Sequence, residues 1–188
     1  MIKIKAKIST AQVKRLQNVV QKTPSRVRNE LNKAINATTK KTQTYIAKEI
    51  ISTEGLNVTG AAVKRTQDKK RSTVRSLGAV IIIRKKDRIP LKDFKARQTK
   101  TGVAYKIRKK GATKVIQGGF KVKAYGNNVY KRPTSRRPTG SRKKGPSVWG
   151  FFLGQKMKPR VKQFIQKQLN KEINERLRVL KLKQAGKI

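Results

Sequence analysis

The chain contains no cysteine and no histidine, and only 8 of its 188 residues are Asp or Glu. Without cysteine and histidine, the chain cannot form a disulfide, a thiolate or imidazole nucleophile, or a zinc site of the usual ligands. The few carboxylates are scattered and leave little material for acid/base chemistry or a two-metal site. These absences predict a protein that is not an enzyme and that needs no metal or cofactor.

Long hydrophobic runs are absent as well. No stretch approaches the roughly 18 consecutive apolar residues of a membrane-spanning helix, so we expect no membrane partner. The first residues, Met1-Ile2-Lys3-Ile4-Lys5, lack the apolar segment of a secretory signal, and we expect none.

What the chain has in excess is positive charge. It carries 51 Lys and Arg residues, and its formal net charge is +43. Such a charge strains a compact monomer through self-repulsion, which predicts a polyanionic partner, and nucleic acid is the first candidate. With 35% apolar and 5% aromatic residues, disorder is the alternative. The apolar residues recur periodically, however, and this pattern favours a folded domain with basic loops.

Helical periodicity dominates both ends of the chain. We predict helical structure over residues 9–51, where Pro24 suits the first position of the longer helix. A short helix is expected after Thr59-Gly60, and a long C-terminal helix over residues 158–183. Apolar stripes support the two long helices. Their members are Val27, Leu31, Ala34, Ile35, Thr38, Tyr45, Ile46 and Ile50, and then Val161, Phe164, Ile165, Leu169, Ile173, Leu177 and Leu180.

Residues 71–132 change to the alternation of strands and predict an antiparallel β-meander. The β-branched run Ile81-Ile82-Ile83 reads as a buried strand. A turn is expected over residues 87–94, because Pro90 excludes a central strand. Residues 132–146 contain three Pro and two Gly and predict a long basic loop. The fold class is therefore α+β: N-terminal helices, a central antiparallel β-sheet with a long basic loop, and a long C-terminal helix, in one domain over residues 1–188.

The positive charge is concentrated in one part of the chain. Residues 94–171 contain 23 Lys or Arg and no Asp or Glu. We interpret this acid-free block as a surface that contacts phosphates, with a solvated charged face as the alternative. No sequence-reading motif is present, which predicts binding without sequence specificity. The candidate nucleic-acid-binding residues are Arg132, Arg136, Arg137, Arg142, Lys143, Lys144, Lys109 and Lys110.

Aromatic residues are few, and each group leaves two interpretations open. Those in the acid-free block alternate at strand spacing, which favours core packing over stacking on nucleic-acid bases. They are Tyr105, Phe120, Tyr125 and Tyr130. The densest cluster, at 149–153, either belongs to the core or anchors an assembly contact. The candidate oligomer or partner interface comprises Trp149, Phe151 and Phe152 together with Leu177 and Leu180 of the last predicted helix.

Two acidic residues deserve a separate interpretation. Asp87 and Asp93 flank Ile89-Pro90-Leu91 and could form a metal pair. No third ligand lies nearby in the sequence, and lysines stand between them. Capping of the predicted turn is the better interpretation.

Several short motifs, taken in order, resemble the prophage minor tail protein Z family, the tail-completion proteins of long-tailed phages. The resemblance covers residues 9–180. It is carried by the motifs TYIAKE at 44–49, VTGAAVKR at 58–65, IPLKDFKARQTKTGV at 89–103, VIQGGF at 115–120 and GPSV at 145–148. The chain departs from the family at Gln117 and Gly119, and its segment between Tyr130 and Gly145 is rewritten as a loop rich in Pro, Arg and Lys.

The resemblance implies a structural virion protein at the head-proximal end of a phage tail, assembled in the host cytoplasm and needed for head-tail joining. It implies a ring, hexameric like the tail tube, that neighbours the tail terminator or tail tube and the head-tail connector proteins at the neck. It further implies contact with the end of the double-stranded phage DNA and offers no catalytic residues. A ribosomal-type RNA-binding protein is the alternative, because it would share the composition and the basic loop.

Overall fold

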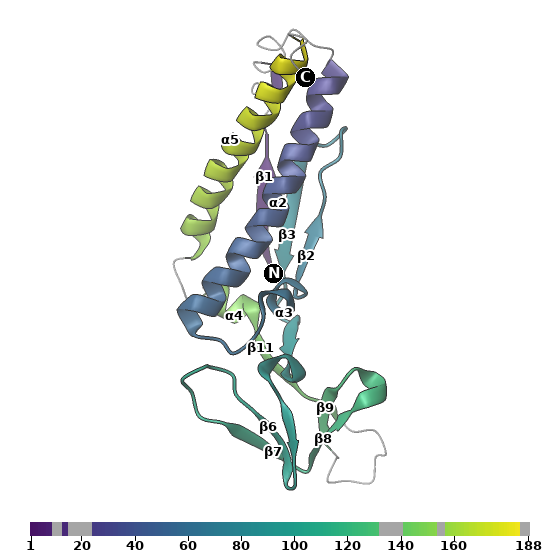
Figure 1. Ribbon diagram of the computed structural model, residues 1–188, viewed down its shortest axis with the longest axis vertical. Coiled ribbons are helices and arrows are strands. Elements are labelled where there is room, and N and C mark those ends of the chain that lie inside the picture. The colour runs from purple at the N-terminus through teal and green to yellow at the C-terminus, as the bar shows by residue number, and fades with distance from the viewer. Residues whose placement is uncertain (9–12, 15–23, 132–140, 154–156, 185–188) are drawn as a thin grey trace. The chain divides into compact units, whose positions relative to one another are not determined.

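The computed structural model describes residues 1–8, 13–14, 24–131, 141–153 and 157–184. It confirms the α+β class (Figure 1). The chain divides into two compact units. We call residues 2–45, 68–82 and 156–188 the helical unit, and residues 46–67 and 83–155, with Met1, the strand unit. The expectation of one domain over residues 1–188 stays a prediction.

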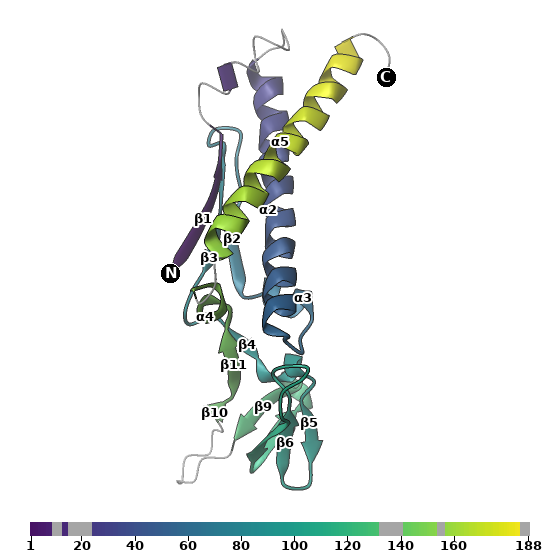
Figure 2. The same cartoon turned by 90° about the vertical axis from the view of Figure 1, so that its left-hand side faces the viewer.

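Two long helices and one small sheet make up the helical unit. The helices are α2 (Pro24–Glu54), whose last residues belong to the strand unit, and α5 (Met157–Gln184). The sheet contains β1 (Ile2–Lys7), β3 (Gly78–Ile83) and β2 (Gln67–Lys70), in the order β1-β3-β2. Figure 2 shows the three strands on one side of α2. In β1 the side chains of Ile2 and Ala6 are buried whereas Lys3, Lys5 and Lys7 are exposed, so only one face of this strand is covered.

The predicted helical stripes form the core of this unit. On α2 the side chains of Val27, Leu31 and Ile35 are at most 2% exposed, and on α5 Val161 and Ile165 are buried. The predictions of the two long helices, including the start at Pro24, are confirmed. The helix expected before Pro24 falls mostly outside the described residues, of which Val13 and Lys14 are helical.

The strands of the helical unit differ from the sequence prediction. Residues 2–7 and 67–70 form β1 and β2, which the sequence analysis did not expect. The meander is predicted to start at residue 71, but its first strand, β3, begins only at Gly78. Side-chain hydrogen bonds explain the delay: the Ser76 N–H donates to Thr73 Oγ1 at 3.1 Å, and the Ser72 hydroxyl donates to the Ser76 carbonyl at 3.1 Å. Such local bonds hold a turn in competition with a ladder.

Short strands dominate the strand unit, and they form three separate sheets. The first pairs β4 (Arg88–Pro90) with β11 (Lys144–Ser147). The second has the order β5-β6-β7, with β5 (Arg97–Thr99), β6 (Gly102–Tyr105) and β7 (Lys114–Gln117). The third has the order β10-β9-β8, with β8 (Gly119–Val122), β9 (Asn128–Lys131) and β10 (Ser141–Arg142). All these pairings are antiparallel.

Helices and 3-10 turns complete the strand unit. The short helix α3 (Gly60–Lys64) begins after Thr59, whose side chain accepts a hydrogen bond from the Ala62 N–H, and this confirms the predicted start. Helix α4 (Val148–Leu153) precedes α5. The 3-10 turns are η1 (Leu91–Phe94) and η2 (Lys123–Tyr125). Buried side chains of Phe94, Val103, Val129 and Phe152 belong to the core.

Two predictions on the strand unit are corrected. The turn expected over residues 87–94 contains the strand β4, and the loop expected over 132–146 contains β10 and β11, while residues 132–140 lie outside the described part. Both predictions rested on proline as a residue that interrupts a strand. Pro90 and Pro146 lie in a two-stranded ladder, where a residue without an N–H is tolerated because each strand keeps a free side.

The predicted meander is likewise divided. Strand β7 pairs with β6, whereas β8 pairs with β9. Gly118, at φ +66°, separates the two sheets. Strand β8 ends at Val122, and η2 begins at the next residue, Lys123.

Candidate nucleic-acid interface

Three carboxylates of the strand unit, Glu54, Asp87 and Asp93, are held in ion pairs. Both oxygens of Asp93 accept hydrogen bonds from Arg65 Nη2, at 3.1 and 3.0 Å, and Glu54 accepts one from Arg108 Nη2 at 2.8 Å. Asp87 lies 3.6 Å from Arg84. Asp87 and Asp93 therefore have separate cationic partners. In the described part of the chain, no group of three acidic residues could hold a metal ion.

The cations of the acid-free block, by contrast, mostly lack an acidic partner. Residues 94–131 and 141–153 contain fourteen Lys or Arg. Across these described residues, Arg108 alone is in a salt bridge. Because the unit's own carboxylates do not neutralise it, this charge is available to an external anion.

Three of the predicted phosphate-binding residues lie beside β9. Arg142, in β10, is exposed and donates from Nη2 to Asn128 Oδ1 at 3.0 Å. The Lys143 N–H donates to the Val129 carbonyl at 2.8 Å, and Lys144 is exposed at the start of β11. The backbone thus brings three consecutive cations to one edge of the β8-β9-β10 sheet. The other predicted loop residues, Arg132, Arg136 and Arg137, lie outside the described residues.

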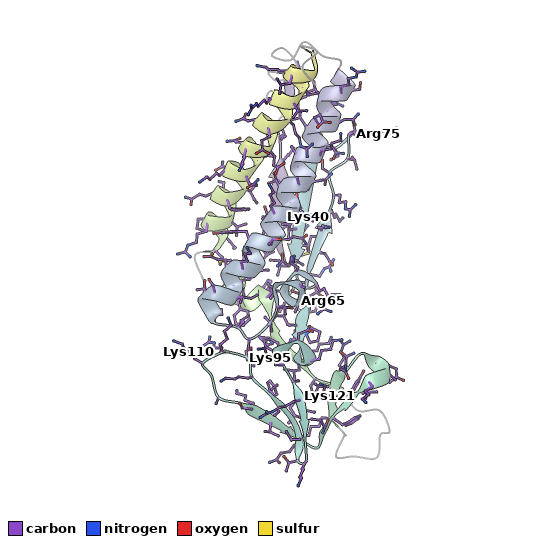
Figure 3. The ribbon with its side chains drawn as sticks, in the orientation of Figure 1. Lys40, Arg65, Arg75, Lys95, Lys110 and Lys121 are labelled. Atoms are coloured by element: carbon purple, nitrogen blue, oxygen red, sulfur yellow. The ribbon has the colours of Figure 1, made fainter. Side chains whose placement is uncertain are left out.

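The other predicted pair, Lys109 and Lys110, occupies a different place. Both are exposed in the connection between β6 and β7, where the Lys109 N–H donates to the Gly55 carbonyl at 2.7 Å. Figure 1 shows this connection and β9 on opposite sides of the strand unit, and Figure 3 labels Lys110. The five predicted residues that the structure describes therefore form two groups, one on each side of the unit.

Further cations of the strand unit were not singled out from the sequence. Lys121 donates from Nζ to the Ala96 carbonyl at 2.9 Å, and Lys92 from Nζ to the Gly126 carbonyl at 2.8 Å. Lys95 is exposed in a left-handed conformation (φ 53°), and Lys123 is exposed in η2 (Figure 3 labels Lys95 and Lys121). In the sequence, only their position in the acid-free block indicates Lys95, Lys121 and Lys123. Residue spacing does not predict which strands pair, and so it does not predict which cations lie side by side.

The predicted aromatic interface is only partly accessible. Phe152 is 1% exposed and so belongs to the core, which corrects its assignment to an interface. Trp149 and Phe151 are half-buried, and the Lys85 ammonium lies 5.7 Å from the centre of the Trp149 ring. On a six-residue helix such as α4, one face must pack inward, and Phe152 occupies that face. Trp149 and Phe151 stay candidates for a partner contact.

The remaining interface candidates lie on α5. Leu177 and Leu180 are half-buried near its C-terminal end, and Val179 beside them is 44% exposed. Their role at an interface stays a prediction.

In the helical unit, two carboxylates link α2 to α5. Glu172 accepts a hydrogen bond from Lys41 Nζ at 2.6 Å, and Glu30 accepts from Lys33 Nζ at 2.6 Å and from Arg176 Nη1 at 3.0 Å. Partial burial acts to raise the pKa of Glu30 and of Glu172. The hydrogen bonds and charges of their cationic partners outweigh it, so each pKa lies below the ordinary value of 4.5.

Comparison of the chain with protein-family models, with curated proteins and with solved structures gave no match. Among the described residues, no helix has the length and apolar character needed to cross a membrane.

Proposed function

We propose that this protein is a structural component of a phage virion that completes the head-proximal end of the tail and supports head-tail joining. In this role it binds the double-stranded genomic DNA through phosphate contacts, without sequence specificity. The cations of the strand unit supply those contacts. Copies of the chain form a ring, which we set at six subunits, next to the tail terminator or tail tube and the connector.

One observation carries the DNA-binding part of the proposal. The described parts of the strand unit hold a set of cations whose charge its own carboxylates, already paired with Arg65, Arg84 and Arg108, do not neutralise. A fold that keeps Glu54, Asp87 and Asp93 in internal ion pairs and leaves most of its lysines without an acidic partner has an excess positive potential. A polyphosphate chain lowers the free energy of such a surface by releasing counterions.

The placement at the tail rests on the order of the family-like motifs. The first, at 44–49 in α2, crosses from the helical unit into the strand unit, and the last, at 145–148, lies at the junction of β11 and α4. A closed ring also suits the charge, because it would align the cations of every copy along one DNA passage.

The location is tested by fractionation. The protein should co-purify with intact virions and remain with the tail or neck after heads and tails are separated. It should be absent from ribosomal subunits washed at moderate salt. Stoichiometric association with ribosomal subunits would instead favour the ribosomal RNA-binding alternative.

A further inference from the structure

The most exposed aromatic side chain of the described residues lies in the acid-free block. Tyr125 is 67% exposed. It ends η2, the turn that joins β8 to β9. The alternation in the sequence favoured core packing for this residue, and that expectation is wrong, because η2 ends the strand before the ring could turn inward.

Hydrogen bonds fix the backbone that displays this ring. The Asn128 side chain donates from Nδ2 to the Tyr125 carbonyl at 2.6 Å, and Lys92 Nζ donates to the Gly126 carbonyl at 2.8 Å. The Asn127 N–H donates to the Val122 carbonyl at 2.9 Å. Gly126 and Asn127 adopt the left-handed conformations, at φ 62° and 58°, that glycine and asparagine tolerate best. An ordered turn therefore holds the Tyr125 ring in solvent.

Two more aromatic rings continue from Tyr125 across the sheet. Phe120 and Tyr130 are register partners on β8 and β9, and their ring centres lie 6.0 Å apart with an interplanar angle of 26°. The Tyr125 and Tyr130 rings are 6.4 Å apart and tilted by 59°. We call these three residues the aromatic row. The side chains of Phe120 and Tyr130 are half-buried, and they support the exposed ring of Tyr125.

Two cations, Lys123 and Arg142, lie near the aromatic row. Lys123 is exposed in the same turn as Tyr125, and Arg142 reaches Asn128 from β10. No acidic residue occurs between residues 94 and 171 of the sequence. The nearest acidic residue in the sequence, Asp93 of η1, is paired with Arg65. An exposed ring next to cations is the combination that binds single-stranded nucleic acid, in which bases stack on the ring and the backbone follows the charge.

We propose that the aromatic row is a stacking site for an unpaired nucleobase, with Tyr125 as the ring that contacts the base and Lys123 and Arg142 as partners of the flanking phosphates. The inference rests on the proposed DNA-binding function and adds a preference for unpaired strands. A protein contact at Tyr125 is the competing occupant. The excess of cations over carboxylates in this part of the sequence favours a polyanion over an ordinary protein surface.

The test compares two DNA probes on three proteins. The affinity of the wild type, Tyr125→Leu and Tyr125→Phe is measured for a 12-nucleotide oligothymidine strand and for a hairpin duplex of the same charge. The two strands of the hairpin are joined by a non-nucleotide linker, so that it offers no unpaired base. Tyr125→Leu should weaken binding of the single strand about 5- to 150-fold, the range that removal of one stacked ring produces. Tyr125→Phe should retain the wild-type affinity, and the hairpin should bind all three proteins equally.

A matched control removes an exposed apolar side chain elsewhere. Val179, 44% exposed on α5, is changed in Val179→Ser, which should leave both affinities unchanged. The inference is overturned if Tyr125→Leu binds the single strand as the wild type does, or loses affinity equally for both probes. Loss of self-association in Tyr125→Leu, with unchanged affinity for the single strand, would assign the ring to a protein contact. Failure of the wild type to bind even the hairpin would reject the proposed function itself.

Discussion

Tyr45 on α2 and Phe164 on α5 stack face to face, with ring centres 4.2 Å apart and an interplanar angle of 7°. The ion pairs Lys41–Glu172 and Glu30–Arg176 follow in the same direction along the two helices. As the residue number falls on α2 it rises on α5, so the helices run antiparallel. Side-chain contacts at three levels therefore hold α5 against α2.

The stacked pair should contribute more than the area it buries. In a double-mutant cycle with Tyr45→Leu and Phe164→Leu, we expect a coupling free energy of about 0.5–1.5 kcal/mol, the range found for aromatic pairs. Urea unfolding monitored by circular dichroism gives the four free energies of unfolding. Additive single changes would show that the rings pack independently.

Acid should weaken the helical unit through Glu30 and Glu172. Because the pKa of each carboxyl is lowered in the folded protein, its ion pairs stabilise the fold above pH 4.5 and are lost as the pH falls through the lowered pKa. The free energy of unfolding should therefore decrease below pH 4.5, and the decrease should be smaller in Glu172→Gln. Urea unfolding at a series of pH values measures both.

Glu175 provides the control for this pH effect. It lies on the same helix, but its side chain is 56% exposed and its oxygen is 4.0 Å from Lys171 Nζ. Glu175→Gln should keep the pH dependence of the wild type. If Glu172→Gln and Glu175→Gln gave the same curve, the Lys41 pair would have no role in acid stability.

A close approach inside the strand unit makes Gly145 necessary. A Cβ atom at Gly145 would lie 2.5 Å from Phe94 Cε2 and 2.9 Å from the Ile89 carbonyl oxygen, and both neighbours belong to buried residues. Gly145→Ala should lower the free energy of unfolding by about 1–3 kcal/mol through overpacking. Thermal unfolding of the variant measures the loss.

Gly150 is the matched comparison. A Cβ atom there meets no atom within 4 Å, and the residue lies inside α4. Gly150→Ala should raise the free energy of unfolding by about 0.5–1 kcal/mol, because alanine favours the helix. An equal loss in both variants would mean that Gly145 is not special.

Helices could be predicted from the sequence better than strands, for a physical reason. In α2 and α5 the apolar period is long enough to mark one face, and the residues at that period, such as Leu31 and Val161, are buried. Strand β1 has only six residues, and β2 only four. Their existence depends on pairing with β3, a contact distant in sequence that no local pattern contains.

The sequence could predict which cations belong to the candidate site, but not where these cations lie relative to one another. The acid-free block correctly marked Arg142, Lys143 and Lys144 as cations of one segment. Nothing local indicated that β10 and β11 would carry them beside β9, away from Lys110. Tyr125 shows the same limit, since the register of β8 and β9 and the turn between them decide its exposure.

The salt dependence of duplex DNA binding shows whether the cations beside β9 contact DNA phosphates. For the wild type, the logarithm of the affinity should fall linearly with the logarithm of salt concentration, with a slope of about −0.9 for each phosphate contacted. The triple variant Arg142→Gln, Lys143→Gln, Lys144→Gln should reduce that slope by about 2–3. A control of equal charge, Lys3→Gln, Lys5→Gln, Lys7→Gln, changes exposed residues of β1 outside the acid-free block and should leave the slope unchanged. A wild-type slope near zero would contradict phosphate binding by the protein. Equal reduction of the slope in both triple variants would contradict a specific role of Arg142, Lys143 and Lys144.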